Sequence, residues 1–283
     1  MAPPVPGAAV LSRPPAAALA LVPGLGPDIA PRAIERLPDG SVNDVYRVDT
    51  RAGSFVLRVD GAEWRRPGVD RGREAVLHAA AAAAGLAPPI VCMRPEWGVL
   101  VTEFLPGAMW SPESFADAAR LAQLGERLGR LHALPVPPVA PFDPLTLAQT
   151  YIAAATRRAR PTWFATRAAC DHVLGELAAA VQQVRAGGRR PAIVHGDLIH
   201  TNLLQDERLW LLDFEYAQVT DPLYDVGCVL AYYPVARPHA VALLAAACPG
   251  ARVTPAELEA AAYVHRALAW LWHLARGEST PPP

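Results

Sequence analysis

Two short polar segments in the C-terminal half of the chain carry residues that can bind a metal ion and move a proton. The first, residues 195–202, reads HGDLIHTN, and the second, residues 213–215, reads DFE. If the two segments lie side by side, Asp197, Asn202 and Asp213 converge. Carboxylate and amide oxygens are the ligands that a hard cation such as Mg²⁺ takes in proteins.

The segments are placed by the apolar runs that precede them. Ile193-Val194 leads into the first and residues 209–212 lead into the second, with the polar turn 205–208 between them. This pattern predicts neighbouring strands of a hairpin. An alternative is that such Asp and Asn residues only form turns by hydrogen-bonding their own backbone. The presence of both segments, in order and at short separation, favours the chemical interpretation.

Length and composition exclude several classes of protein. The 283 residues fit one large domain or two lobes. The net charge is −1 and no basic stripe is present, which argues against nucleic-acid binding. No apolar run approaches the roughly 20 residues that span a bilayer. The four cysteines are scattered without a CxxC pair, which indicates reduced thiols and a cytoplasmic protein.

The N-terminal part of the chain is predicted to be β-rich. Residues 1–23 are rich in Pro and Ala, and we expect them to be disordered. Residues 24–104 would form a small lobe that ends in a hinge over 104–107. Its predicted elements are a hairpin over 45–48 and 55–59, a helix over 72–84 closed by Gly85, and strands over 91–93 and 99–102.

Residues 105–283 are predicted to form a larger, mainly helical lobe. Ser111 and Pro112 have the residue types of a helix start. A single helix from there would place leucines 121, 124, 128 and 131 on one face. Thr254 and Glu257 form a capping box for the last helix. Further helices are predicted over 147–158, 163–185, 225–233 and 236–247, and the last over 254–276. The predicted fold class is therefore α+β and bilobal.

The spacing H-x-D-x-x-x-x-N followed by D-F resembles the catalytic and metal loops of kinases. With the bilobal pattern, residues 33–276 resemble the small-molecule branch of the protein-kinase-like fold. That branch holds aminoglycoside phosphotransferases and choline, ethanolamine and thiamine kinases. The resemblance implies ATP and Mg²⁺ as cofactors. It also implies that Asp197 accepts or orients the proton of the substrate hydroxyl, while Asn202 and Asp213 hold Mg²⁺ on the ATP phosphates.

The resemblance also assigns nucleotide-binding residues in the small lobe. Arg58 stands where the family places a phosphate-binding cation, and Glu74 would be its ion-pair partner. Choline and ethanolamine kinases resemble this chain in using Arg there, whose planar fork suits bidentate contacts. The alternative is an ordinary surface pair that contributes little to stability.

Two further stretches would contact the nucleotide. The stretch 40–43, which includes Ser41 and Asn43, has a single glycine and could cradle phosphate with its backbone amides. At the end of the strand over 99–102, Glu103 and Leu105 would offer backbone groups to adenine.

Departures from the protein-kinase pattern narrow the substrate class. Gly196 replaces the Arg that binds a phosphorylated activation loop, and Asp213 and Asp225 are only twelve positions apart. Glu215 replaces a glycine that would tolerate positive φ. A protein substrate is therefore not expected. Asp225 is predicted to be a helix N-cap that braces residues 195–202, called the catalytic segment below, and His195 is predicted to be a bracing residue.

The residues of the C-terminal part of the chain indicate which class of small molecule accepts the phosphate. From Tyr216 onward there are five acids and four arginines, which does not suit a polycationic aminoglycoside. Glu215, Trp270 and Trp272 are candidate substrate residues, since aromatic faces attract quaternary ammonium groups. The two tryptophans are two positions apart, so at most one can line a cage; they could instead be packing residues.

The sequence thus predicts a kinase of a small amino alcohol such as choline, ethanolamine or thiamine, without nucleic-acid or membrane partners. Two alternatives remain open. One is an antibiotic phosphotransferase. The other is a catalytically silent nucleotide-binding protein of the same fold, against which the joint retention of Asp197, Asn202 and Asp213 argues.

Overall fold

The computed structural model describes residues 13–26, 29–37, 43–61, 67–157, 163–278 and 281–283. The chain divides into two compact units, Met1–Gly107 and Ala108–Pro283, each of which is described by itself. The division lies close to the boundary at residues 104–105 that the sequence predicts.

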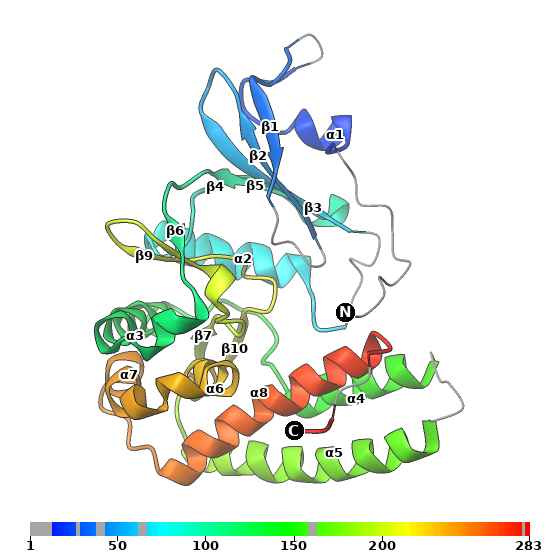
Figure 1. The fold of residues 1–283 in the computed structure, drawn as a ribbon, viewed down its shortest axis with the longest axis vertical. Helices are drawn as coiled ribbons and strands as arrows, with labels where there is room; N and C mark the ends of the chain where they lie inside the picture. The colour runs from blue at the N-terminus through cyan, green and yellow to red at the C-terminus, as the bar shows by residue number, and fades with distance from the viewer. Residues whose placement is uncertain (1–12, 27–28, 38–42, 62–66, 158–162, 279–280) are drawn as a thin grey trace. The chain divides into compact units, whose positions relative to one another are not determined.

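Unit 1 is built on a five-stranded antiparallel sheet with the order β1-β2-β3-β5-β4 (Figure 1). The predicted hairpin is confirmed, since β2 and β3 pair along their full lengths. Tyr46, Leu57 and Val101, from three adjacent strands, are completely buried and form the centre of the core. The strands are β1 (Ala33–Arg36), β2 (Asn43–Asp49), β3 (Ser54–Asp60), β4 (Ile90–Arg94) and β5 (Val99–Glu103).

A short helix, α1 (Ala16–Leu19), belongs to the same core. Ala18 and Val22 are almost fully buried in the cluster that contains the strand residues. The side chain of Thr50 donates to the carbonyl of Pro23 at 2.9 Å and ties this segment to β2. The disorder expected over residues 1–23 therefore does not hold for residues 13–23, whose apolar side chains cover the sheet; residues 1–12 lie outside the described part.

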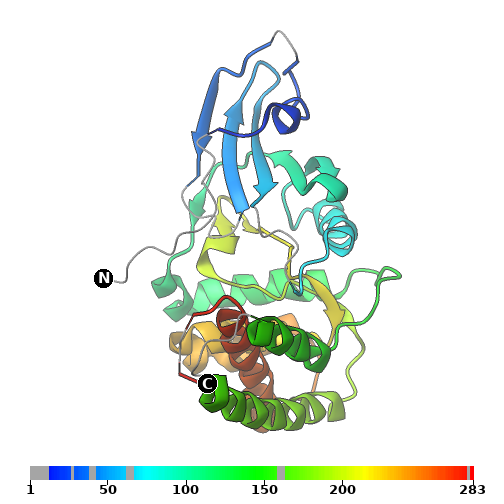
Figure 2. The same cartoon turned by 90° about the vertical axis from the view of Figure 1, so that its right-hand side faces the viewer.

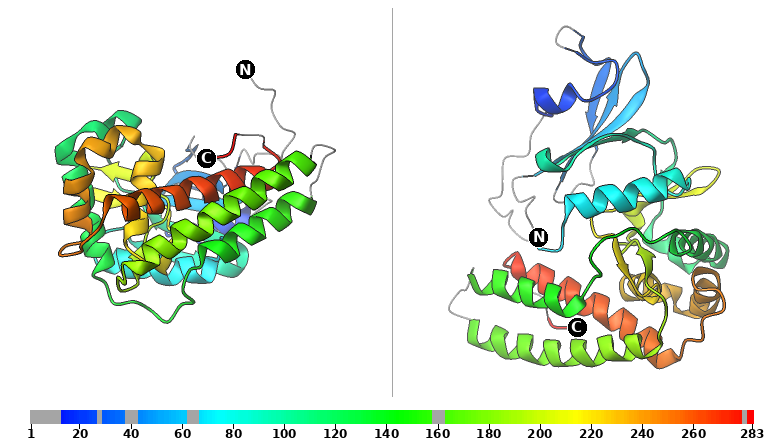
Figure 3. Two further views of the ribbon diagram at one scale, coloured as in Figure 1. Left: turned by 90° about the horizontal axis from the view of Figure 1, so that it is seen from below. Right: turned by 180° about the vertical axis from the view of Figure 1, so that it is seen from behind.

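The longer helix of unit 1, α2 (Arg71–Ala83), supplies Glu74. It begins one residue before the predicted start, because the side chain of Asp70 caps it by accepting from the Arg73 amide. Gly85, with φ of 67°, follows its end as expected. The helix and the short η1 (Pro95–Trp97) can be followed in the right-hand view of Figure 3.

Unit 2 is mainly helical. Its last helix, α8, packs against α4, α5 and α6, and α3 packs against α7 (Figure 2). The capping box at Thr254 and Glu257 is confirmed at the start of α8. The α-helices are α3 (Ala118–His132), α4 (Pro144–Arg157), α5 (Trp163–Ala186), α6 (Leu223–Tyr232), α7 (Ala240–Ala247) and α8 (Pro255–Ala275).

Two of the predicted helices are each divided. Ser111 and Pro112 start only a 3₁₀-helix, η2 (Pro112–Ala116). A separate helix, α3, starts because Asp117 caps it by accepting from the amides of residues 119 and 120. Similarly, the predicted helix over 236–247 consists of η4 (Pro234–His239), which contains Pro238, and α7. A proline inside a helix removes a backbone donor, which accounts for the break.

Short strands lead into the two polar segments. The predicted hairpin is present, with β8 (Leu203–Gln205) paired to β9 (Leu209–Leu211) and β6 (Ala108–Met109) beside it. The apolar run before Asp197 forms β7 (Ala192–Val194), which pairs with β10 (Gln218–Thr220). Among the described residues, no helix is both long and apolar enough to cross a membrane.

Close packing of α6 on α8 predicts the effect of two glycine substitutions. A Cβ added at Gly227 would lie 2.6 Å from the backbone of Ala261, whereas a Cβ at Gly175 on α5 would meet nothing within 4 Å. We expect Gly227→Ala to lower the free energy of unfolding by about 1–3 kcal/mol. Gly175→Ala should raise it by up to about 1 kcal/mol, because alanine is the better helix former. Chemical denaturation measures both, and equal effects would contradict the assigned contact.

Candidate active site

Asp197 and Asn202 lie together in the first polar segment. The chain leaves β7 at Val194, and a short 3₁₀-turn, η3 (His200–Asn202), returns it toward β8. The side-chain nitrogen of Asn202 (Nδ2) donates to the backbone carbonyl of Asp197 at 2.9 Å and to its carboxylate at 3.0 Å. The five-residue spacing in the sequence therefore closes into a direct side-chain contact.

Asp213 follows β9 and is held beside this turn. The amide of Leu212 donates to the carbonyl of Asn202 at 2.9 Å, which fixes the two polar segments to one another. Asp213 has a φ of 56°, and among the described residues it is the one non-glycine residue with positive φ. The absence of a glycine at position 215 does not prevent this turn, because the residue with the left-handed backbone conformation is Asp213. Such backbone strain is held where the surrounding structure fixes a functional side chain.

The two polar segments bring several negative charges together. Burial, together with the nearby carboxylates of Asp213 and Glu215, raises the pKa of Asp197 to about 7, although the hydrogen bond from Asn202 opposes the shift. The carboxylates therefore lie close enough to repel one another. Such a cluster favours a cation and keeps Asp197 able to take up a proton near neutral pH.

The donor set fits Mg²⁺. The described residues hold no group of three or more His, Cys, Asp or Glu side chains arranged as a metal cage. Because Asn202 directs its side-chain nitrogen to Asp197, the oxygen of the same amide would be the atom that ligates a metal ion, and Asp213 would supply a carboxylate. Mg²⁺ is commonly bound by one or two carboxylates plus substrate phosphates and waters, rather than by an all-protein cage.

Asp225 fixes the backbone of the catalytic segment. Its carboxylate accepts from the amides of His195 at 3.0 Å and Gly196 at 2.9 Å. The expected bracing contact is present, but the predicted N-cap is wrong. Helix α6 starts at Leu223 after Pro222, so Asp225 lies inside its first turn. There its side chain turns toward the catalytic segment.

His132 was not identified from the sequence, although it completes this brace. Its Nε2 lies 2.9 Å from the Asp225 carboxylate and its Nδ1 lies 2.9 Å from the carbonyl of Ala247. Burial opposes the charge on His132, but the hydrogen bond with Asp225 prevails and raises its pKa to about 10. The same pair lowers the pKa of Asp225 against the effect of burial. The only signal in the sequence is a histidine ending a helix with a regular leucine face.

His195 has the bracing contacts expected of it. It is fully buried, and its Nδ1 accepts from the Asp197 amide at 3.3 Å. Its Nε2 therefore carries the hydrogen and donates to the carbonyl of Leu212 at 2.8 Å. Burial lowers the pKa of His195, which keeps the imidazole neutral. The ring joins the two polar segments without carrying charge.

Two further residues support the segment, and neither was singled out from the sequence. The hydroxyl of Tyr233 accepts from the His200 amide at 2.8 Å. The thiol sulfur of Cys228 accepts from the Leu198 amide at 3.3 Å. Cys228 lies in the middle of α6 and Tyr233 directly after its end, so this helix contacts the segment at several points.

In unit 1, the expected ion pair of Arg58 and Glu74 is present. The Nη1 of Arg58 lies 2.7 Å from Oε1 of Glu74, and its Nη2 donates to Oε2 at 2.9 Å. The side chains are 7% and 0% exposed, so this is not a surface pair. Burial opposes ionisation, but Arg58 and then Arg71 lower the pKa of Glu74 to about 2.

Arg71, which the sequence analysis did not single out, extends this pair into a network. Its Nη1 lies 2.7 Å from Glu74, while its Nε and Nη2 donate to the two oxygens of Asp60 at 2.8 and 2.6 Å. Glu74 is therefore bound by two guanidinium groups. If Arg58 turns to a phosphate, the charge of Glu74 remains balanced by Arg71.

The remaining nucleotide candidates of unit 1 are less informative. Asn43 is buried, and its side-chain oxygen lies 3.4 Å from Nη2 of Arg71. Ser41 lies outside the described residues. The Glu103 amide donates to the carbonyl of Pro89 at 3.0 Å, so it is not available to a base. Leu105 follows β5 and is partly buried.

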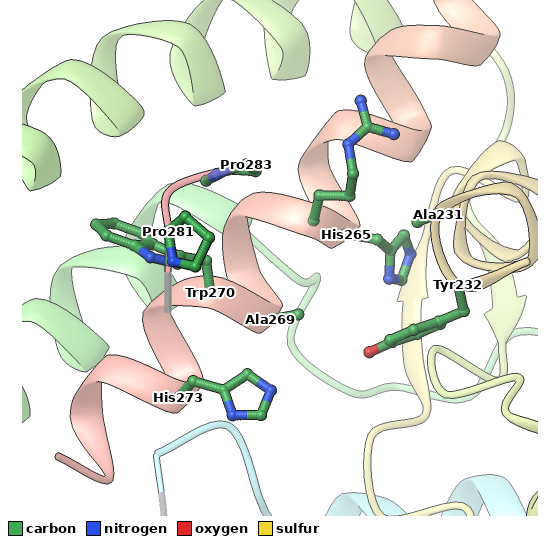
Figure 4. Close-up of a pocket in the computed structure, with 9 residues that line it drawn as sticks. Ala231, Tyr232, His265, Ala269, Trp270, His273, Pro281 and Pro283 are labelled. Atoms are coloured by element: carbon green, nitrogen blue, oxygen red, sulfur yellow. The ribbon is translucent and has the colours of Figure 1, made fainter. Parts of the chain in front are cut away.

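The candidate substrate residues of unit 2 separate into different environments. Trp270 is 6% exposed and lines a pocket of about 260 Å³ between α6 and α8 (Figure 4). Trp272 does not line this pocket and instead lies under the guanidinium of Arg276, 4.7 Å from it. This agrees with the expectation that at most one tryptophan faces a ligand. Glu215 is buried, and its charge contributes to the raised pKa of Asp197.

Comparison with known proteins identifies the family. Residues 33–263 match the phosphotransferase enzyme family. A choline/ethanolamine kinase family protein from Mesorhizobium loti is 28% identical over 91% of this chain and 82% of that chain, with a TM-score of 0.69. The comparison with curated proteins found no match.

More distant structures share the fold. The choline kinase LicA from Streptococcus pneumoniae is 17% identical over 88% of each chain, with a TM-score of 0.72. An aminoglycoside phosphotransferase in a ternary complex with ADP and hygromycin B is 15% identical over 88% of each chain, with a TM-score of 0.59. The chain therefore belongs to the phosphotransferase enzyme family. It is a small-molecule phosphotransferase with a protein-kinase-like fold.

The charged pair of His132 and Asp225 predicts that a His132 variant differs from the wild type in stability by an amount that depends on pH. The pKa of His132 is raised in the folded state, so its contribution is complete below its unfolded value of 6.5 and is lost as pH rises toward about 10. We expect His132→Gln to lower the free energy of unfolding by about 3 kcal/mol at pH 6, because it leaves Asp225 buried without its ion partner. The deficit should shrink by pH 9.5.

His172→Gln is the matched control. The side chain of His172 is 71% exposed, and it lies 3.6 Å from Glu176. We expect its substitution to change stability by no more than about 0.5 kcal/mol at either pH. Urea denaturation at the two pH values measures both variants. A deficit for His132→Gln that stays constant from pH 6 to pH 9.5 would refute the charged pair.

Proposed function

We propose that this protein transfers the γ-phosphate of ATP to a hydroxyl group of a small molecule. Asp197 would accept or orient the proton of that hydroxyl, and Asn202 and Asp213 would hold Mg²⁺. The observation that carries the proposal is the double contact of Asn202. Its side-chain nitrogen donates to the carboxylate of Asp197, and its backbone carbonyl accepts from the amide of Leu212, the residue before Asp213. The three side chains thereby lie on two segments that are hydrogen-bonded to one another.

The chemistry of phosphoryl transfer suits these residues. The reaction depends on positioning and charge stabilisation more than on covalent catalysis. When bound, Mg²⁺ neutralises charge on the phosphates. Asp197, oriented by Asn202 and raised in pKa by its surroundings, is suited to receive a proton from an alcohol. Arg58, held by Glu74, would be a cation for the nucleotide phosphates, and Ser41 and Asn43 are further candidates for the phosphates. Leu105 would offer its backbone to the base; Glu103 could do so only with its carbonyl, because its amide is bound to Pro89.

An amino alcohol such as choline, ethanolamine or thiamine is the acceptor class we favour. Support comes from the choline and ethanolamine kinases among the similar structures. An antibiotic phosphotransferase is the alternative, supported by the similarity to aminoglycoside phosphotransferases. Use of ATP agrees with the cytoplasmic location that the sequence predicts.

A phosphotransfer assay tests the proposal. Wild-type protein with Mg²⁺, ATP and a panel of amino alcohols should release ADP and form a phosphate ester. Asp197→Asn should lower kcat by about 10²–10⁴-fold, because it removes the proton acceptor while keeping the contact with Asn202 possible. Binding of Mg·ATP, followed by thermal shift, should persist in this variant.

Asp171→Asn is the control for loss of an acid, since this residue is exposed on α5. Its activity should equal that of the wild type. If wild-type protein binds Mg·ATP but phosphorylates no hydroxyl compound, the catalytically silent alternative is correct. Resistance to an aminoglycoside on expression would instead favour the antibiotic phosphotransferase.

A further inference from the structure

We propose that Cys228 is a positioning residue for Asp197, because its thiol contacts the backbone on both sides of this carboxylate. The inference rests on the proposed function and concerns the same site. The sulfur of Cys228 lies 3.3 Å from the amide nitrogen of Leu198, which donates to it. The thiol also donates to the carbonyl of Gly196, over the longer distance of 4.0 Å.

These two contacts restrain both backbone rotations of Asp197. The Gly196 carbonyl belongs to the peptide group that precedes the Cα of Asp197, and the Leu198 amide belongs to the peptide group that follows it. Because peptide groups are planar, φ and ψ are the two soft rotations that orient a residue. A side chain that contacts both neighbouring peptide groups therefore fixes the direction in which the Asp197 carboxylate leaves the backbone.

Helix α6 holds the sulfur in place. Cys228 follows Asp225 by three positions, so the two side chains lie on the same face of the helix. Asp225 accepts from the amides of His195 and Gly196, and Cys228 continues this series of contacts to Leu198. Groups on a helix are held more precisely than groups on a loop. The position of the sulfur is therefore set by the fold and not by a substrate.

A thiol can make both contacts at once. The sulfur of a cysteine is a weak acceptor, and its hydrogen is a weak donor. Cys228 is fully buried, and burial raises the pKa of its thiol well above the usual value. The hydrogen therefore stays on the sulfur, where it can be directed at the Gly196 carbonyl.

Removal of the thiol would leave the Leu198 amide buried without its acceptor. Because a buried donor without a partner is costly, we expect the catalytic segment to shift and to turn Asp197 with it. A displacement of about 1 Å in a reacting group can lower a rate about 10²-fold. The loss should fall on kcat, because the proton passes to Asp197 in the transition state and not when the substrates bind.

Steady-state kinetics of three variants with the amino-alcohol panel test the inference. Cys228→Ala should lower kcat about 10–100-fold and change the KM values for ATP and acceptor by less than about threefold. Cys228→Val fills the space without polar groups and should lose kcat in the same way, so it serves if the alanine variant does not fold. Cys228→Ser keeps a donor and an acceptor, and its kcat should lie within about fivefold of the wild type.

Cys170→Ala and Cys170→Val are the matched controls. Cys170 lies on α5 and is as fully buried as Cys228, but among the described residues its thiol has no hydrogen-bond partner. Truncation to alanine removes the same atoms from the interior of unit 2, so it should lower the stability without lowering kcat. Urea denaturation measures the loss of stability in each pair of variants.

Hydrogen exchange tests the positioning without an assay of activity. Residues 195–202 should exchange faster in Cys228→Ala or Cys228→Val than in the wild type, and at the wild-type rate in the Cys170 variants. The inference is wrong if these Cys228 variants keep the wild-type kcat or exchange rate, or if Cys228→Ser is no more active than they are. If wild-type protein phosphorylates no compound of the panel, the proposed function fails, and hydrogen exchange alone decides the role of Cys228.

Discussion

The buried carboxylate of Asp225 is the contact on which the geometry of the catalytic segment depends. It accepts from two consecutive amides, those of His195 and Gly196. Gly196 can present its amide there because it has a φ of 78°, and a Cβ at this position would lie 2.5 Å from the carbonyl of Tyr216. His132 balances the charge of Asp225 inside the protein. The position of Asp197 is thus set by a buried ion pair between α3 and α6, and not by the loop alone.

The contacts of Asp225 hold the catalytic segment firmly enough to tolerate electrostatic repulsion and backbone strain next to it. Asp197, Asp213 and Glu215 repel one another, and Asp213 has a backbone conformation that side chains rarely adopt. Such local conflicts are expected at functional sites, where the rest of the structure must stabilise them. Binding of a cation would relieve the repulsion, so the same carboxylates that destabilise the protein would favour Mg²⁺ in the proposed site.

The sequence predicted those features that depend on local spacing. Asp197 and Asn202 are five positions apart, and their contact follows from a single turn; the hairpin and the capping box of α8 are equally local. The brace could not be predicted, since His132 and Asp225 are far apart in the chain and only tertiary packing joins them. The same holds for Arg71 with Asp60 and Glu74. At Ser111 the local signal was misleading, because Asp117 offers a competing cap that starts α3.

In the proposed function Asn202 and Asp213 hold a metal ion on the nucleotide, and a measurement of metal binding tests this role. Electron paramagnetic resonance can count bound Mn²⁺ in the presence of a non-hydrolysable ATP analogue. Asp213→Asn is a suitable variant because Asn tolerates positive φ. We expect this variant to bind Mn²⁺ at least about tenfold more weakly than the wild type. Equal affinity of the two proteins for Mn²⁺ would contradict it.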